Sequence, residues 1–122
     1  FTGEEDLWEA TKAGARGTYS SLVMTNPALL LEFYEECAAG NEFVVTALSA
    51  RFSRFVQEAI LPLAPDDDKA GYWDSALDRL QAMLNPNMRC GLRCQRPYAS
   101  PTQADLDGIR SWIEHNDPEL LL

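Results

Sequence analysis

One segment, Glu42 to Leu61, constrains the fold of this chain most strongly, because its apolar side chains recur every three or four residues. This spacing gathers them on one side of an α-helix and leaves Arg51, Arg54 and Glu58 between them. Pro62 follows and ends the pattern, since proline has no N–H to continue a helical ladder. The segment therefore predicts an amphipathic helix whose buried face is formed by Val44, Val45, Leu48, Phe52, Phe55, Val56, Ala59 and Ile60.

Capping signals predict further helical structure on the N-terminal side of this segment. Residues 2–5 have the form of a capping box and open a short helix, which Gly14 and Gly17 weaken. Thr18 is a candidate cap for a brief turn that runs through Met24.

A second, better defined helix begins at Asn26 and Pro27, a capping residue followed by the proline that suits the first helical position. Gly40 is its expected end, because glycine accepts the left-handed conformation that often closes a helix. Its predicted buried face consists of Leu30, Phe33, Tyr34 and Cys37.

Two helices are predicted after Pro62. Residues 66–68 are three aspartates that cap the first of them, and residues 85–86, Asn-Pro, end it. Residues 100–103 repeat the sequence of a cap, a proline and a capping box, with Ser100 as the expected cap of a last helix that ends near Asn116. The inward side chains of the two helices are Trp73, Ala76, Leu77, Leu80 and Leu84 in the first, and Leu106, Ile109 and Ile113 in the second.

Residues 85–101 contain three prolines and one glycine and have no periodicity, so we expect a long irregular loop there. We find no convincing strand pattern and no internal repeat. The predicted fold is therefore all-α, a single compact bundle of four to six helices with one long loop. We expect residues 1–122 to form one domain. Because the chain begins at Phe1 and stops in a run of leucines, we also expect it to be a piece of a larger protein.

The loop is part of a segment whose charge is opposite to that of the chain. Between Arg79 and Ala104 there are four arginines, Arg79, Arg89, Arg93 and Arg96, and no acidic residue, whereas the whole chain has a formal net charge of −9. A locally basic segment in an acidic chain is a candidate contact for an anionic group. We call residues 85–101 the arginine loop.

The acidic remainder of the chain disfavours nucleic acid as a ligand for the body of the domain, because phosphate binding depends on massed lysine and arginine. No apolar run is long enough to cross a membrane, so we expect no membrane span. Glu32, Glu35, Glu36 and Glu42 form an acidic patch, which we interpret as a solvated face, with a docking surface for a basic peptide as the alternative.

Cys90 and Cys94 lie in the arginine loop and have three alternative states. With His115 and Cys37 they would supply the four ligands of a structural zinc site, although their spacing is not that of a zinc knuckle. A disulfide between them is a second alternative. We favour free thiols and no cofactor, and we do not expect so polar a loop to bury either sulfur. The odd number of cysteines favours an intracellular location, in the cytoplasm or nucleus.

No motif in the chain predicts catalysis. His115 is the only histidine, and near the end of a helix it is more suited to contact backbone carbonyls than to serve as an acid or base. We therefore expect a non-enzyme.

The aromatic residues separate into two groups. We place Trp8, Trp73, Trp112, Tyr19 and Tyr72 mainly in the core, and Tyr98 outside it because it belongs to the arginine loop. Tyrosine with arginine is a combination enriched at protein interfaces. The sequence thus predicts a helical protein-interaction or regulatory domain that binds a protein partner through the loop and an adjacent helix face, with Arg89, Arg93, Arg96 and Tyr98 as contact residues.

The alternative function is a domain that senses a small ligand or forms a homodimer. Leu29 and Leu31 favour it, because with Leu30 they place apolar side chains all round one helix, more than a single buried face needs. The leucines at positions 120–122 favour it for the same reason.

Overall fold

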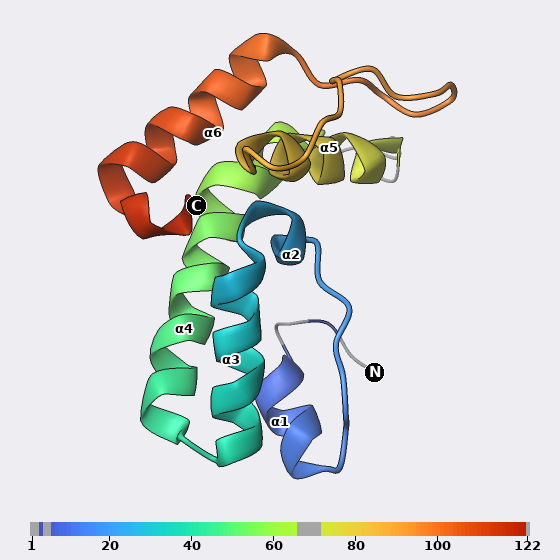
Figure 1. The fold of residues 1–122 in the computed structure, drawn as a ribbon. Coiled ribbons are helices and arrows are strands. Elements are labelled where there is room, and N and C mark those ends of the chain that lie inside the picture. Colours follow the sequence, from blue (N-terminus) through green and yellow to red (C-terminus); the bar gives the residue numbers. More distant parts are fainter. Residues whose placement is uncertain (1–2, 4–5, 66–71, 122) are drawn as a thin grey trace.

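The computed structural model describes residues 3, 6–65 and 72–121, and in these ranges it contains helices and no β-strand. The predicted all-α, compact fold is confirmed. The described part has six α-helices (Figure 1), which are α1 (Leu7–Lys12), α2 (Leu22–Thr25), α3 (Pro27–Ala39), α4 (Glu42–Phe55), α5 (Asp74–Leu84) and α6 (Gln103–Asn116). The expected caps in residues 2–5 and 66–68 lie wholly or partly outside the described residues.

Helices α3 and α4 form an antiparallel pair whose ends are fixed by local capping. The Asn26 side-chain oxygen accepts a hydrogen bond from the Leu29 N–H at 3.1 Å, and Pro27 occupies the first helical position, as predicted. Gly40 closes α3 with a positive φ of 75°, a left-handed conformation that glycine adopts without a Cβ clash. The short connection through Gly40 and Asn41 turns the chain directly into α4.

The long helix predicted up to Leu61 changes its geometry before it ends. It is α-helical to Phe55, continues as a π-helix, η2 (Val56–Ile60), and closes as a 3₁₀ turn, η3 (Leu61–Leu63). Pro62 lies within that last turn, where its missing N–H stops the helical ladder. The predicted face is nevertheless the buried one, with Val45, Leu48, Phe52, Phe55, Ala59 and Ile60 in the core and Val44 and Val56 packed against it.

The core is built from phenylalanine and aliphatic side chains, and the predicted core position of the larger aromatics was wrong for Trp73, Tyr19 and Tyr72. Phe33 and Phe52 meet edge to face, with ring centroids 5.3 Å apart. Trp8 and Trp112 are half-buried and pack against the core, Trp73 is half-buried, and Tyr19 and Tyr72 are exposed. Trp73 is not on the inward face of α5 because the helix begins at Asp74, one residue later. Amphipathic indole and phenol rings are readily accommodated at the edge of a core.

The start of α6 differs from the prediction by two residues. Thr102, and not Ser100, is the cap, and it forms a reciprocal capping box with Asp105. The Thr102 hydroxyl accepts from the Asp105 N–H at 3.2 Å, and the Asp105 carboxylate accepts from the Thr102 N–H at 2.7 Å. The Ser100 hydroxyl is engaged elsewhere, by the backbone of the arginine loop. Leu106, Ile109 and Ile113 are buried, as predicted.

Helix α5 lies crosswise near one end of the α3–α4 pair, and α6 follows beyond it (Figure 1). Helix α5 packs on α2 and α6, and its residue Gln81 donates a hydrogen bond to the Ser21 hydroxyl at 3.0 Å. One continuous core contains Leu7 of α1, Leu22 of α2 and Leu80 of α5, together with residues of the other three α-helices.

The segment after α6 returns to α4. Arg51 of α4 pairs with Asp117 in a bidentate contact and with Glu119 at 3.4 Å. The hydrogen bonds that the guanidinium donates to the Asp117 carboxylate raise its pKa. Leu120 is buried in the core and Leu121 packs against it, so these two leucines do not form the exposed apolar surface that the sequence suggested. No helix within the described ranges has both the length and the apolar character that a membrane span requires.

Candidate functional site

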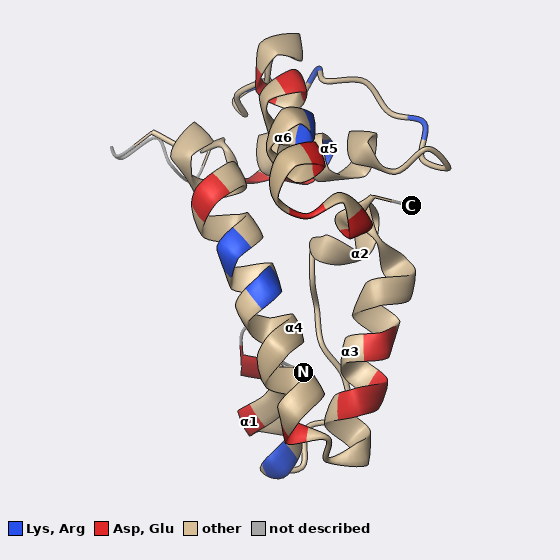
Figure 2. Ribbon diagram, turned by 90° about the vertical axis from the view of Figure 1, so that its left-hand side faces the viewer, with Lys and Arg blue, Asp and Glu red and all other residues tan. Residues whose placement is uncertain are grey.

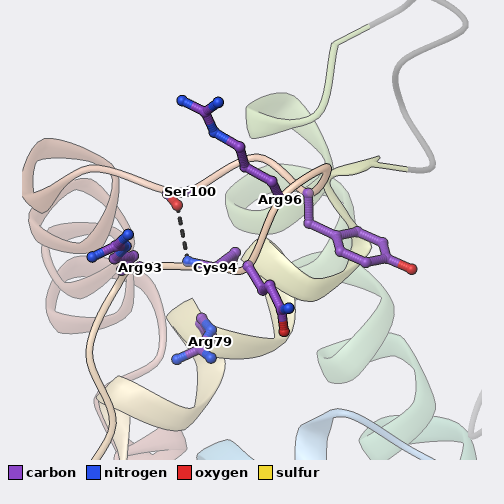
Figure 3. Close-up of a pocket in the computed structure, with 7 residues that line it drawn as sticks. Arg79, Arg93, Cys94, Arg96 and Ser100 are labelled. Atoms are coloured by element: carbon purple, nitrogen blue, oxygen red, sulfur yellow. Dashed lines mark hydrogen bonds between the residues drawn. The ribbon is translucent and has the colours of Figure 1, made fainter.

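A pocket of about 630 Å³ lies where the arginine loop passes over α5 (Figure 3). Three of its lining residues are arginines and none is acidic. The loop that joins α5 to α6 carries blue segments and no red ones in Figure 2. The lining consists of Arg79, Arg93, Cys94, Gln95, Arg96, Tyr98 and Ser100.

Arg79 is the part of the pocket that α5 contributes. It is half-buried, and one of its terminal nitrogens, Nη1, donates a hydrogen bond to the Gly91 carbonyl at 2.8 Å. This bond ties the first half of the arginine loop to the helix. A guanidinium has five N–H donors, so Arg79 retains donors for a ligand after this contact.

Ser100 closes the loop on the other side of the pocket. Its hydroxyl oxygen accepts a hydrogen bond from the Cys94 N–H at 2.9 Å, which draws residues 94 and 100 together (Figure 3). The oxygen acts as acceptor in this bond, so the hydroxyl proton remains available for donation. Pro101, the next residue, is buried and anchors the end of the loop.

The Cys94 thiol is buried beneath this crossing, with 7% of the residue exposed. The expectation that a polar loop leaves both sulfurs accessible was therefore wrong for Cys94. The loop folds back on itself and on α5, and this long-range packing buries the thiol despite the polar composition of the segment. Cys90 is half-buried.

Tyr98 lines the pocket and is 45% exposed, in agreement with its predicted position outside the core. Its ring contacts that of Tyr72, with centroids 6.4 Å apart. The N–H of Ala99 donates to the Tyr72 carbonyl at 2.9 Å. These contacts attach the second half of the loop to the residues just before α5.

The pocket arginines have no acidic counterpart among the described residues. The arginines that form ion pairs in the described ranges are on α4. Arg51 pairs with Asp117 and Glu119, and Arg54 pairs with Glu58. Arg89, the fourth arginine of the basic segment, is exposed in the same loop and does not line the pocket. The structure thus brings Arg93, Arg96 and Tyr98 to one site and leaves Arg89 outside it.

The structure does not assemble the four residues of the alternative zinc site. Cys37 is buried in α3, where burial raises the pKa of its thiol. His115 is exposed on α6, and its Nδ1 lies 2.7 Å from the Ser111 carbonyl oxygen, the type of contact expected for it. In the described part of the chain, no three histidine, cysteine or acidic side chains are grouped as a metal site, and the three cysteines are free.

Sequence reasoning did not identify Arg79, Gln95 and Ser100 as pocket residues. For Arg79 a signal was present, because it begins the acid-free segment and lies outside the apolar face of its helix. Gln95 and Ser100 carry no comparable signal. Their positions depend on how the loop folds back over α5.

No protein-family model, curated protein or solved structure matches this chain. The pocket between α5 and the arginine loop is the feature of the described chain that points to a function.

Proposed function

We propose that this chain is a helical protein-interaction or regulatory domain and that it binds an acidic segment of a partner protein at the pocket between α5 and the arginine loop. The observation that supports the proposal is the set of three arginines without acidic counterparts in the described ranges, Arg79, Arg93 and Arg96, in one pocket. Arginine and tyrosine are enriched at interface hot spots, and Tyr98 is an exposed residue of the pocket lining.

Charge favours a short acidic peptide over a long polyanion. The net charge of −9 on the whole chain repels an extended nucleic acid, whereas a short peptide needs only the local positive field. The same charge pattern attracts acidic segments to the pocket and repels them from the acidic rest of the surface.

A peptide-display selection tests the proposal and does not require the partner to be identified first. A random peptide library is selected on the wild-type chain and on the Arg93→Glu, Arg96→Glu double variant in parallel. We expect the wild type to enrich acidic peptides and the double variant to lose them, with added salt weakening the binding. Enrichment of the same peptides on both proteins would contradict the proposal.

Two controls keep this result interpretable. Circular dichroism and the melting temperature of the double variant should match those of the wild type, because exposed charges contribute little to stability. The variant Arg89→Glu changes an arginine of the same loop that lies outside the pocket. The Arg89→Glu variant should lose less binding than the single variant Arg93→Glu.

The alternative, a ligand-sensing or homodimerising domain, retains some support from exposed apolar side chains. Leu31 is 57% exposed on α3 and Phe43 is 85% exposed at the start of α4. Size-exclusion chromatography with light scattering tests dimerisation directly. A monomer at high concentration would contradict the homodimer.

A further inference from the structure

We propose that the acidic group taken by the pocket is a phosphate monoester on a side chain of the partner, so that phosphorylation of the partner controls binding. This inference rests on the proposed function and names the chemistry of the group that the same pocket recognises. It depends on three features of the pocket: the placement of its donors, its charge, and its size.

The donors are spread around the pocket lining (Figure 3), and a tetrahedral anion can contact donors on more than one side. In the close-up view the Ser100 hydroxyl lies between the side chains of Arg93 and Arg96, and Arg79 lies on the other side of the loop backbone (Figure 3). A carboxylate is planar and has two oxygens, whereas a phosphate monoester presents three oxygens in three directions. We assign the guanidiniums of Arg93 and Arg96 and the Ser100 hydroxyl as the donors to those three oxygens.

The charge of the pocket also favours a dianion. A phosphate monoester carries roughly −1.5 to −2 charges near neutral pH, about twice the charge of one aspartate. Arginine binds phosphate through paired, charge-assisted N–H contacts, which are stronger than neutral hydrogen bonds. The lining supplies three guanidiniums and no carboxylate to oppose the ligand.

The volume of about 630 Å³ is larger than one phosphate group needs, so the flanking part of a peptide has room beside it. The exposed ring of Tyr98 in the lining offers an aromatic surface for that part of the ligand. The Ser100 hydroxyl keeps its proton for a ligand, because its oxygen serves as the acceptor in the bond from the Cys94 N–H.

Fluorescence anisotropy with three labelled peptides tests the inference. The peptides are identical stretches of glycine and alanine except at the central residue, which is phosphoserine, aspartate or serine. We expect the phosphoserine peptide to bind at least about tenfold more tightly than the aspartate peptide. The serine peptide should show no saturable binding.

Single arginine variants locate the interaction. Arg93→Gln and Arg96→Gln should each weaken binding of the phosphoserine peptide about tenfold, whereas Arg89→Gln removes an equal charge from the same loop and should weaken it much less. A chemical-shift titration of the ¹⁵N-labelled protein with the phosphoserine peptide should move the backbone amides of residues 93–100. Equal losses of affinity in all three variants would mean that binding depends only on net charge, and this would overturn the assignment of the phosphate site to the pocket.

The outcomes separate this inference from the proposed function. Equal affinity for the phosphoserine and aspartate peptides would overturn the phosphate preference and leave the acidic-peptide function standing. If neither peptide binds and the display selection fails as well, both the phosphate preference and the acidic-peptide function are overturned. Competition by inorganic phosphate at the same concentration as the phosphopeptide would reassign the pocket to a free anion, and tighter binding of a short oligonucleotide would reassign it to nucleic acid.

Discussion

Phe52 and Phe43 are the same side chain on the same helix in opposite environments. Phe52 is 4% exposed and contacts the Phe33 ring, whereas Phe43 is 85% exposed. We expect Phe52→Ala to lower the free energy of unfolding by about 3–5 kcal/mol, because it leaves a cavity in the core. Phe43→Ala is the matched control and should change stability by less than about 0.5 kcal/mol. Urea unfolding of both variants measures the difference, and similar midpoints would contradict the assigned core.

The three cysteines should differ in their reactivity toward an alkylating reagent. Cys37 and Cys94 are buried, Cys90 is half-buried, and burial raises the pKa of the Cys37 thiol, which lowers its thiolate fraction. We expect native protein to be alkylated first at Cys90, and all three thiols to react after denaturation. Peptide mass spectrometry after a short pulse of iodoacetamide shows the order. Rapid labelling of Cys94 in the native protein would mean that the loop is open in solution.

Asp78 is expected to reduce stability at neutral pH. Burial, and then the nearby charge of Asp74, raise the pKa of the Asp78 carboxyl in the folded protein above its ordinary value of 3.8. The stabilising effect of the protonated carboxyl is therefore complete below that ordinary value and is lost as pH rises through the folded-state pKa. Asp78→Asn should raise the free energy of unfolding at neutral pH, and the gain should shrink as the pH approaches the ordinary value from above.

The control for this variant is Glu114→Gln, which removes one negative charge from an exposed position on α6. Any general relief of repulsion in the acidic chain appears in both variants. Chemical denaturation at several pH values measures both. A gain for Asp78→Asn that does not exceed that of the control at neutral pH would contradict the assigned burial effect.

At the scale of single elements, α6 depends on its capping box. Thr102→Ala removes the acceptor for the Asp105 N–H, and we expect a loss of about 1 kcal/mol in the free energy of unfolding. Thr102→Ser keeps the hydroxyl and should stay within about 0.5 kcal/mol of wild type. Thermal denaturation followed by circular dichroism compares the two, and equal melting temperatures would show that the box does not stabilise the helix.

Helix boundaries could be predicted from the sequence where they depend on capping residues close by in the chain. The ends of α3 were predicted correctly because Asn26, Pro27 and Gly40 act through contacts within a few residues of the chain. Trp73 and Ser100 were misassigned because the first residue of α5 and the bonding partner of the Ser100 hydroxyl have no distinct signal in the sequence. Trp73 precedes the first turn of α5, and the Ser100 hydroxyl is used by Cys94, so the cap of α6 falls to Thr102.

At the scale of the whole molecule, the basic segment was visible in the sequence but its pocket was not. Composition indicated Arg93, Arg96 and Tyr98, and the structure places them in one lining with Arg79 of α5 and with Ser100. That assembly requires the loop to return to the helix from which it departs, which no local pattern encodes. The same long-range folding buries Cys94, and the described cysteines and His115 form no metal cluster.

Helix α5 contributes both to the core, through Ala76 and Leu80, and to the pocket, through Arg79. The hydrogen bond from Arg79 to the Gly91 carbonyl also holds the loop against the helix. A substitution at Leu80 that tilts the helix would move Arg79 and the loop together. A saturation mutagenesis screen scored by ligand capture would therefore mark Ala76 and Leu80 as sensitive positions, although neither lines the pocket. Measuring the abundance of each variant in parallel would separate residues that touch the ligand from those that hold the helix in place.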